Sequence, residues 1–230
     1  MVKTEKAQFT KSHIGTHERS VIIGKTGSGK SVLFDTLLKF LAKKTLIILI
    51  DTKREYEHIP DFKLKFLKAN KGLYRVYELK HRGKTIDNVP TVVEFISNLL
   101  FARKNCMLAI EEMSQATKKN AYRLGDIMPH LNKLLTQGRS RGVGFLGTSQ
   151  RPQQVHTDFL SQADHIISFE VTSTHDLKAM RTYIDEKHYE GLKRFEFIHY
   201  NMKGNYLRHC YKLYLSKQEK AYYESIFGKY

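Results

Sequence analysis

The sequence has 230 residues, enough for one sizeable α/β domain but too few for several. Its 39 lysine and arginine residues outnumber the 23 acidic residues, and the resulting formal charge of +16 favours a polyanionic partner, either nucleic acid or an anionic membrane surface. The longest apolar run, Leu46 to Ile50, is too short to span a bilayer, and we expect neither a signal peptide nor a disulfide framework, so an intracellular setting is the default.

Residues 1–19 are polar and rich in lysine, and they are expected to form a basic arm or an edge element. Residues 20–230 are expected to form a single domain. His13 and His17 lie four residues apart, but no carboxylate or cysteine pattern accompanies them, which argues against a metal site there.

A phosphate-binding loop is the most informative feature of the chain. Val21 to Ile23 suit a buried strand, and Gly24 to Ser31 then match the P-loop pattern Gly-x4-Gly-Lys-Ser. A helix predicted from Lys30 to Lys44 presents its positive end to the phosphates, as do the N–H groups of the curled loop. The expected nucleotide contacts are Gly24, Lys25, Thr26, Gly27, Ser28, Gly29, Lys30, Ser31 and Val32.

A second buried strand and a basic segment follow the P-loop helix. Thr45 to Asp51 is continuously aliphatic up to its last residue, which predicts a parallel strand covered on both faces, with Asp51 at the carboxyl edge where ligands gather. The segment from Lys53 to Lys84 combines many cations with aromatic residues, a composition suited to contact with a nucleic-acid backbone. Leu73 to Leu79 within it can form a strand.

Two adjacent acids end the next predicted strand. A helix from Thr91 to Arg103 precedes the apolar residues Met107 to Ile110, which lead directly into Glu111 and Glu112. Such a strand followed by paired carboxylates predicts a Walker B element, with Glu111 at Mg²⁺ and Glu112 polarising the attacking water. Glutamate at the first position is less common than aspartate.

The segment around residues 138–152 carries three further candidate residues. A mostly helical stretch from Asn120 to Gln137, broken before Pro129, leads to a strand from Val143 to Gly147. Gln150 lies at the carboxyl end of that strand, beside the phosphates. Arg139 and Arg141 precede the strand, so they are expected to reach the active site of a neighbouring subunit rather than their own.

The rest of the chain completes an α/β fold. We expect a strand from Ala163 to Val171, a helix from Thr174 to Tyr183, and a β-hairpin whose turn uses the glycine of Lys203-Gly204-Asn205. A helix from Lys217 to Phe227 follows. Together these elements predict three αβα layers around a mostly parallel central sheet, with a C-terminal β-hairpin plus helix.

On these motifs, the chain resembles the FtsK/HerA superfamily of DNA-pumping P-loop ATPases from about Ser20 to Thr182. Two stretches carry the resemblance beyond the Walker elements: Asp51-Thr-Lys-Arg-Glu55-Tyr56, and the run from Gly138 to Pro152. The resemblance implies a RecA-like motor domain, a sensor glutamine, an arginine supplied in trans, and a hexameric or pentameric ring around duplex DNA. The chain is most similar to the genome-packaging ATPases of tailless double-stranded DNA viruses with an internal membrane.

The expected function is therefore ATP-driven translocation of double-stranded DNA into a preformed viral capsid. ATP and Mg²⁺ are the expected cofactors, and capsid or internal-membrane vertex proteins are possible partners, in the host cytoplasm or at the virion vertex. The expected catalytic residues are Lys30, Glu112, Gln150, Arg139 and Arg141, with Ser31 and Glu111 at the metal. From position and charge, Lys118, Lys119 and Arg123 are candidate DNA contacts.

Two other functions stay open at this stage. A plasmid-mobilisation or DNA-repair translocase of the same superfamily would share every motif named above. A P-loop kinase is less favoured, because the sequence shows neither an arginine-rich lid between the Walker elements nor an acceptor site.

Overall fold

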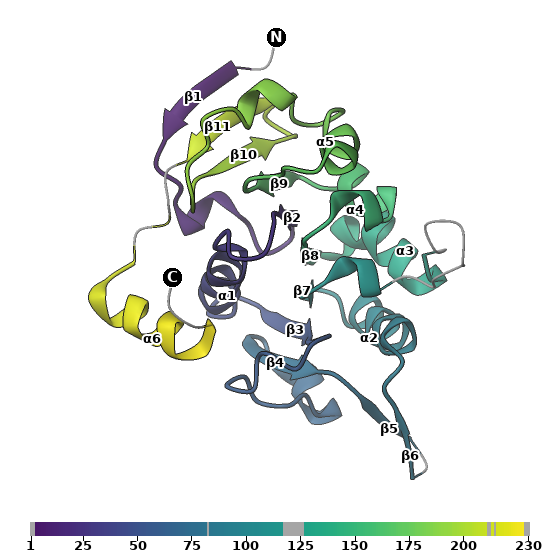
Figure 1. The fold of residues 1–230 in the computed structure, drawn as a ribbon. Coiled ribbons are helices and arrows are strands. Elements are labelled where there is room, and N and C mark those ends of the chain that lie inside the picture. The colour runs from purple at the N-terminus through teal and green to yellow at the C-terminus, as the bar shows by residue number, and fades with distance from the viewer. Residues whose placement is uncertain (1–2, 82, 117–126, 211–212, 214, 228–230) are drawn as a thin grey trace.

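A nine-stranded sheet between two layers of helices dominates the computed structural model, which describes residues 3–81, 83–116, 127–210, 213 and 215–227 (Figure 1). The strand order is β1-β11-β10-β9-β2-β8-β7-β3-β4. The bounds are β1 Lys3–Ala7, β2 Arg19–Ile23, β3 Leu46–Ile50, β4 Gly72–Val76, β7 Cys106–Ile110, β8 Val143–Ser149, β9 His165–Ser168, β10 Phe197–Asn201 and β11 Tyr206–Cys210. The predicted fold class, a three-layer P-loop NTPase with a mostly parallel sheet, is confirmed.

The six strands from β9 to β4 are parallel to one another, and β4 forms one edge of the sheet. The five strands other than β4 are buried along their whole length, as the lack of alternation in the aliphatic runs predicted. The hairpin of β10 and β11 joins this sheet antiparallel to β9, and β1 then pairs in parallel with β11 at the edge. The first strand of the chain is thus an edge element.

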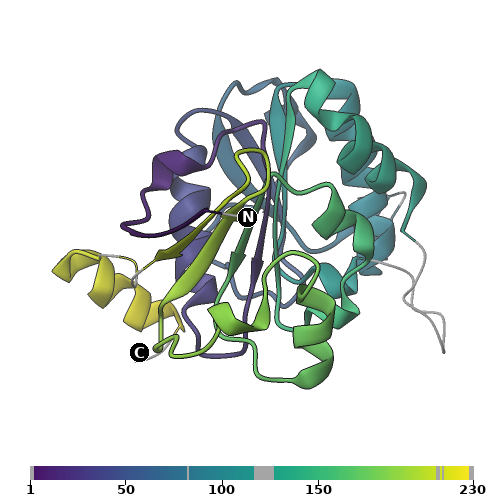
Figure 2. The ribbon, with the colours of Figure 1, turned by 90° about the horizontal axis from the view of Figure 1, so that it is seen from above.

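Helices cover both faces of the sheet, as the view from above shows (Figure 2). On one face α1 buries Leu33, Leu37 and Leu41 against strand residues such as Ile22 and Leu49. The other face is covered by α2, α3 and α4. The helices are α1 Lys30–Leu41, α2 Val89–Arg103, α3 Pro129–Gln137, α4 Thr157–Ser161, α5 Thr174–Met180 and α6 Lys217–Phe227.

The C-terminal helix α6 packs on the outer side of α1 rather than on the sheet. The hydroxyl groups of Thr36 and Tyr223 lie 2.8 Å apart, and Lys39 lies 3.7 Å from the ring centre of Tyr222. The helix bearing the P-loop is therefore held between the sheet and α6.

Several predicted boundaries are wrong, for different reasons. Helix α1 ends at Leu41 rather than at Lys44, because the carbonyl of Ala42 accepts a hydrogen bond of 3.1 Å from the Gly72 N–H at the start of β4. Helix α2 begins at Val89 because the Asn88 side chain caps it. The strand predicted up to Leu79 ends at Val76.

Leu79 belongs to a separate two-stranded sheet formed by β5 (Leu79–His81) and β6 (Lys84–Ile86). This hairpin extends away from the main sheet in Figure 1. The strand predicted from Ala163 to Val171 is likewise shorter, since β9 comprises only His165–Ser168.

Two further predictions concern the helix around Pro129 and the turn between β10 and β11. The helix predicted from Asn120 falls partly outside the described residues, and its described part begins at Pro129, where the break was expected. In the β10–β11 turn the left-handed conformation falls on Asn205, with φ +48°, and not on Gly204. Asparagine tolerates this conformation better than most residues, so it takes the role assigned to glycine.

Candidate nucleotide site

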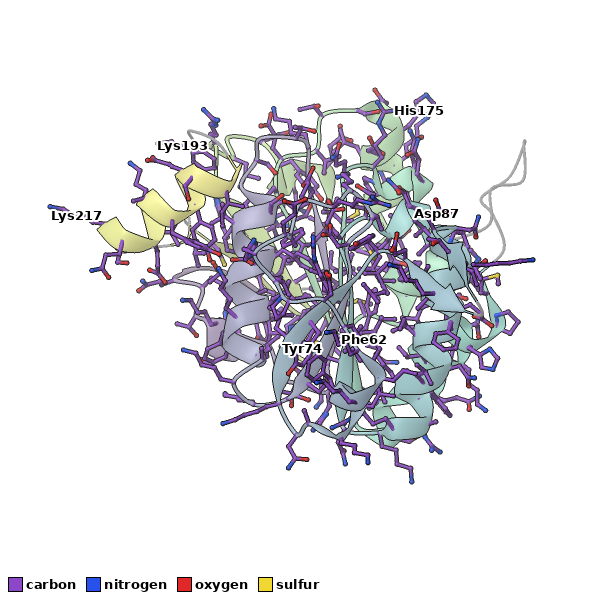
Figure 3. The ribbon with its side chains drawn as sticks, turned by 90° about the horizontal axis from the view of Figure 1, so that it is seen from below. Phe62, Tyr74, Asp87, His175, Lys193 and Lys217 are labelled. Carbon is purple, nitrogen blue, oxygen red and sulfur yellow. The ribbon has the colours of Figure 1, made fainter. Side chains whose placement is uncertain are left out.

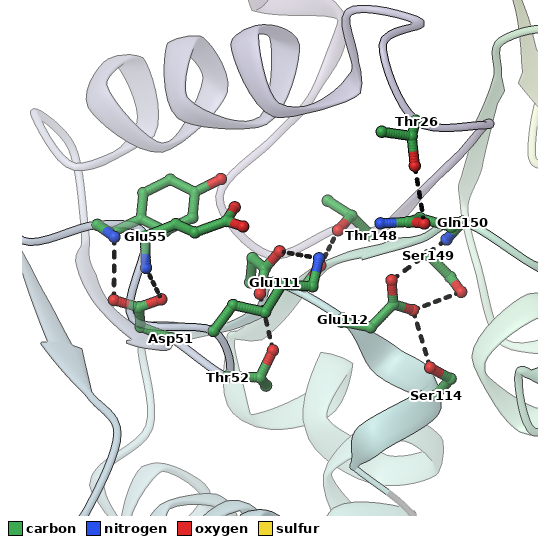
Figure 4. Close-up of polar contacts among 12 residues, drawn as sticks. Thr26, Asp51, Thr52, Glu55, Glu111, Glu112, Ser114, Thr148, Ser149 and Gln150 are labelled. Atoms are coloured by element: carbon green, nitrogen blue, oxygen red, sulfur yellow. Dashed lines mark hydrogen bonds and ion pairs between the residues drawn. The ribbon is translucent and has the colours of Figure 1, made fainter. Parts of the chain in front are cut away.

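Four strand ends meet at the carboxyl edge of the sheet. In the parallel register Ile23 of β2 faces Ser149 of β8, and Ile50 of β3 faces Ile110 of β7. The segments that follow these strands are the P-loop, the turn after Asp51, the Glu111–Glu112 pair and Gln150. The fold therefore brings the predicted nucleotide, metal and catalytic residues of these segments to one edge of the sheet (Figure 4).

The P-loop is tied to the strands beside it. The Gly24 N–H donates to the Ser149 carbonyl (3.2 Å) and the Lys25 N–H to the Glu170 carbonyl (3.3 Å), while the Lys25 ammonium pairs with the Glu170 carboxylate at 2.7 Å. Gly29, at the start of α1, has φ +98° and lies so close to Phe195 that an added Cβ would be 3.1 Å from the ring. Only glycine fits both demands.

Lys30 is largely buried at the first position of α1. Burial lowers the pKa of its ammonium, and the carboxylates of Glu112 and Glu111 act against that shift. A bound phosphate chain would stabilise the charged form of this ammonium, because phosphate oxygens would accept the hydrogen bonds that water can no longer accept at a buried site.

The Glu111 carboxylate is held by two donors from the turn after β3. The Thr52 hydroxyl donates to Oε2 (2.7 Å) and the Lys53 ammonium to Oε1 (2.8 Å). Burial raises the pKa of Glu111, and these two hydrogen bonds oppose the rise. The Thr148 hydroxyl of β8 donates to the main-chain carbonyl of the same residue, so both its side chain and its main chain are fixed.

The Glu112 carboxylate is oriented by a separate set of donors. Oε1 accepts from the hydroxyl groups of Ser149 (2.7 Å) and Ser114 (3.0 Å), and Oε2 accepts from the Gln150 N–H (3.3 Å). The side chain is nearly buried. A carboxylate fixed in this way beside the phosphate loop can orient a water molecule and accept its proton.

Gln150 connects the P-loop with the Walker B pair. Its main-chain N–H contacts Glu112, and its side-chain oxygen accepts a hydrogen bond of 3.0 Å from the Thr26 hydroxyl. A ligand that takes the Thr26 hydroxyl would release the amide of Gln150.

The donor set suits Mg²⁺ bound together with a nucleotide. Ser31 and Glu111 supply hard oxygen atoms, the ligands that Mg²⁺ prefers, and phosphate oxygens commonly complete its octahedron. Within the described ranges, no group of three or more His, Cys, Asp or Glu residues could hold a metal ion. A site completed by the nucleotide is therefore the arrangement that these residues fit.

Asp51 organises the neighbouring turn instead of facing a ligand. Its fully buried carboxylate accepts hydrogen bonds from the N–H groups of Glu55 (3.0 Å) and Tyr56 (3.1 Å) and from Arg75 (3.3 Å). The turn that carries Thr52 and Lys53 is thereby held against the sheet.

The two predicted trans arginines lie in the turn Gly138–Arg141, directly before β8. This turn is at the amino edge of the parallel strands, whereas the P-loop is at the carboxyl edge. Arg141 donates to the Phe101 carbonyl (2.9 Å), and its guanidinium stacks over the Phe101 ring at 4.6 Å. Arg139 pairs with the buried carboxylate of Asp164, but its side chain remains 49% exposed. Arg139 is thus exposed, whereas Arg141 is half-buried.

The candidate DNA contacts Lys118, Lys119 and Arg123 lie outside the described residues. In the basic segment the aromatic rings are engaged within the chain: Phe66 and Tyr74 stack at 4.1 Å, and Arg54 lies 4.6 Å from the ring centre of Tyr77. Tyr74 belongs to edge strand β4, and both it and Phe62 pack against the hydrophobic core (Figure 3). These rings pack internally, so the cations rather than the aromatics suit contact with a nucleic acid.

Comparison with known proteins identifies the family. The profile of the family described as "Helicase HerA, central domain" matches residues 16–137, which is more than half of the chain. The chain belongs to this family. Its predicted membership of the FtsK/HerA superfamily is confirmed, and this HerA-family chain is a P-loop ATPase, as the Walker elements predicted. A search of curated proteins found no match.

Solved structures share the fold of this HerA-family chain. The DNA-packaging ATPase B204 from Sulfolobus Turreted Icosahedral Virus gives a TM-score of 0.71 at 22% identity, covering 87% of this chain and 100% of B204. B204 from Sulfolobus turreted icosahedral virus 2 in complex with ATP-gammaS gives 0.69 at 21% identity, covering 88% and 100%. The pCW3 conjugation coupling protein TcpA gives 0.59 at 16% identity, covering 92% and 64%.

Four site residues of the HerA-family chain were not predicted as such: Thr52, Lys53, Ser114 and Ser149. All of them bind the Walker B carboxylates, and three lie within three residues of the end of a strand. That position was a usable signal, because polar residues directly after neighbouring parallel strands meet at the same edge. Which residue would bind which carboxylate was not readable from the sequence.

No helix in the ranges that the structure describes is long and apolar enough to cross a membrane.

Proposed function

We propose that the protein is an ATP-hydrolysing motor that translocates double-stranded DNA, and that it packages a viral genome into a preformed capsid. One observation carries this proposal. The P-loop, the Walker B pair and Gln150 lie at one edge of the sheet, whereas the exposed Arg139 lies at the opposite edge. In a chain arranged in this way, Arg139 would reach a nucleotide only on a second copy.

Each site residue has a role in this proposal. ATP binds along Gly24 to Val32, where Lys30 neutralises the phosphates, and Ser31 with Glu111 holds the Mg²⁺ that stabilises charge on them. Glu112 accepts the proton of the attacking water. Gln150 exchanges its contact with Thr26 for one with the γ-phosphate and so senses the bound nucleotide.

Arg139 is the better candidate for the trans cation. The guanidinium of Arg141 is already bound by the Phe101 carbonyl and ring, so moving it would lose two contacts. Arg139 makes one ion pair, with Asp164, and about half of its side chain is exposed. A ring of subunits would place it beside the neighbour's phosphates, where such a cation raises the rate by about 10³ to 10⁵.

DNA as the substrate is supported by charge and by fold. The chain has a formal charge of +16, and its lysine and arginine side chains would bind the phosphates of duplex DNA independently of the base sequence. B204, described as a DNA-packaging ATPase, is covered over its full length by this chain. With this role, the protein would act in the host cytoplasm or at the virion vertex, in a hexameric or pentameric ring that meets capsid or internal-membrane vertex proteins.

Mixing two inactive variants tests the shared site. Lys30→Ala subunits lack a working phosphate site but keep Arg139, and Arg139→Ala subunits have the opposite defect. Each variant alone should show almost no ATPase activity in the presence of DNA, and the mixture should regain a measurable part of it. Arg141→Ala is the matched control and should need no complementation. Absence of recovery, with rings still visible by electron microscopy, would contradict the trans role of Arg139.

Translocation itself is tested by displacement of a third strand from duplex DNA. ATP should drive the displacement, and a non-hydrolysable analogue should not. ATPase activity that DNA fails to stimulate, together with no displacement, would refute the motor.

A plasmid-mobilisation or DNA-repair translocase is the alternative, and the fold shared with the conjugation coupling protein TcpA favours it over a kinase. Gene neighbourhood separates these functions: a capsid gene nearby supports packaging, and a nuclease gene supports repair. A phosphorylated small-molecule product instead of free phosphate would point to a kinase.

A further inference from the structure

Lys53 binds the carboxylate that the metal site needs. Its ammonium lies 2.8 Å from Glu111 Oε1, while the Thr52 hydroxyl takes Oε2 at 2.7 Å. The Glu111 side chain is only 5% exposed, so few other groups can approach it. Both oxygen atoms of the acid thus already have a donor from the turn after β3.

The turn that carries Lys53 has a fixed main chain and a movable side chain. Asp51 binds the N–H groups of Glu55 and Tyr56, and Arg54 adopts φ +61°, an unfavourable value for a residue other than glycine. The Lys53 side chain is 30% exposed, and its ammonium is carried by a flexible four-carbon chain. It can therefore leave Glu111 without any change in the fold.

A cation at this position has an electrostatic reason. Glu111 and Glu112 are adjacent acidic residues whose side chains are nearly buried, and a nucleotide would add phosphate charge beside them. Lys30 and Lys53 each interact with both carboxylates. Lys30 is committed to the phosphates in the proposed function, which leaves Lys53 to balance Glu111.

We propose that Lys53 is a positioning residue that holds Glu111 while the site lacks a metal and competes with Mg²⁺ for that carboxylate. The inference rests on the proposed function, because it requires an Mg²⁺–nucleotide site at Glu111. Binding of the metal then frees the Lys53 ammonium, so the turn after β3 changes its contacts whenever an Mg²⁺–nucleotide enters or leaves.

Binding of a fluorescent ATP analogue to the full chain, in EDTA and during a titration with Mg²⁺, tests this inference without measuring turnover. Lys53→Met should lower the Mg²⁺ concentration at half-saturation about three- to tenfold, the effect of losing one partly exposed charged hydrogen bond. It should also weaken binding in EDTA, because Glu111 then repels the phosphates. Lys53→Arg keeps the charge and should stay within about twofold of the unaltered protein.

Arg54→Met is the matched control. It also removes one positive charge from the turn, but the Arg54 side chain contacts Tyr77 and Glu78 rather than Glu111. It should leave the Mg²⁺ midpoint unchanged. An equal shift in both variants would assign the effect to net charge and overturn the inference. Weaker binding of Lys53→Met under both conditions would make Lys53 a phosphate ligand and overturn it as well. If the unaltered protein bound no nucleotide, the proposed function itself would fail.

Discussion

A buried histidine pair predicts that the protein loses stability in mildly acidic solution. His199 of β10 is 0% exposed, and its Nε2 lies 3.0 Å from Nδ1 of His165, whose Nε2 lies 2.9 Å from the Glu18 carboxylate. Burial lowers the pKa of His199 from 6.5 to about 3, with the charges of His165, His13 and Arg208 acting in the same direction and that of Glu18 against it. His199 is therefore neutral in the folded protein.

The size of the effect follows from proton linkage. Because the pKa of His199 is lower in the folded state, the unfolded state binds more protons between pH 6.5 and pH 3. The free energy of unfolding is therefore unaffected by His199 above pH 6.5, and it falls as the pH is lowered from 6.5 towards 3. Between pH 7 and pH 5 the loss is about 2 kcal/mol, a large share of a typical unfolding free energy of about 5–15 kcal/mol.

Urea unfolding at pH 7 and pH 5 measures this loss. His199→Gln keeps a hydrogen-bonding group next to His165 but cannot titrate. From pH 7 to pH 5 the unaltered protein should therefore lose about 2 kcal/mol more of its free energy of unfolding than the variant does. His175→Gln is the control, because His175 is exposed on α5 (Figure 3). Equal losses in His199→Gln and the unaltered protein would refute the assignment. The lowered pKa of Glu18, at about 2, acts mainly below pH 4.5 and does not disturb the comparison.

Three further predictions concern the site and the turns. Glu112→Gln should retain ATP binding while the turnover rate falls at least about 100-fold, and an equal loss of binding would indicate a structural carboxylate. Asp51→Asn weakens three hydrogen bonds to a buried carboxylate, so thermal unfolding should show a loss of stability of about 1–3 kcal/mol; an unchanged stability would contradict the anchoring role of Asp51. Asn205→Gly removes a strained left-handed residue and should stabilise the protein by about 0.5–1 kcal/mol, so destabilisation would show that its side chain matters more than its φ.

The sequence predicted the interior of the sheet well, because strands such as β3 and β7 are buried on both faces and contain hardly any polar residue to blur them. It predicted element ends less well. The end of α1 depends on a hydrogen bond between Ala42 and Gly72, residues that only the folded sheet brings together. The hairpin β5–β6 was missed since its short strands lie outside the main sheet.

The site shows the same division. That Glu111 and Gln150 follow neighbouring strands was readable from the order of motifs, since the carboxyl ends of parallel strands share an edge. The pairing of Lys53 with Glu111 joins residues 58 positions apart, and that of Arg139 with Asp164 depends on which strands are adjacent at the amino edge. The sequence could indicate that such residues share an edge of the sheet, but not which of them pair.

Strand β8 connects the two halves of the proposed shared site. Gln150 follows its last residue, Ser149, and Arg139 lies four residues before its first residue, Val143. Six steps along an extended strand cover about 20 Å, and β8 is paired on both sides within the sheet, so it cannot bend independently of its neighbours. In a ring, a displacement of Gln150 by the γ-phosphate would therefore reach Arg139 through a rigid element. In the ring of the proposed function, β8 would thus link the nucleotide site of one subunit with the arginine that this subunit offers to the next.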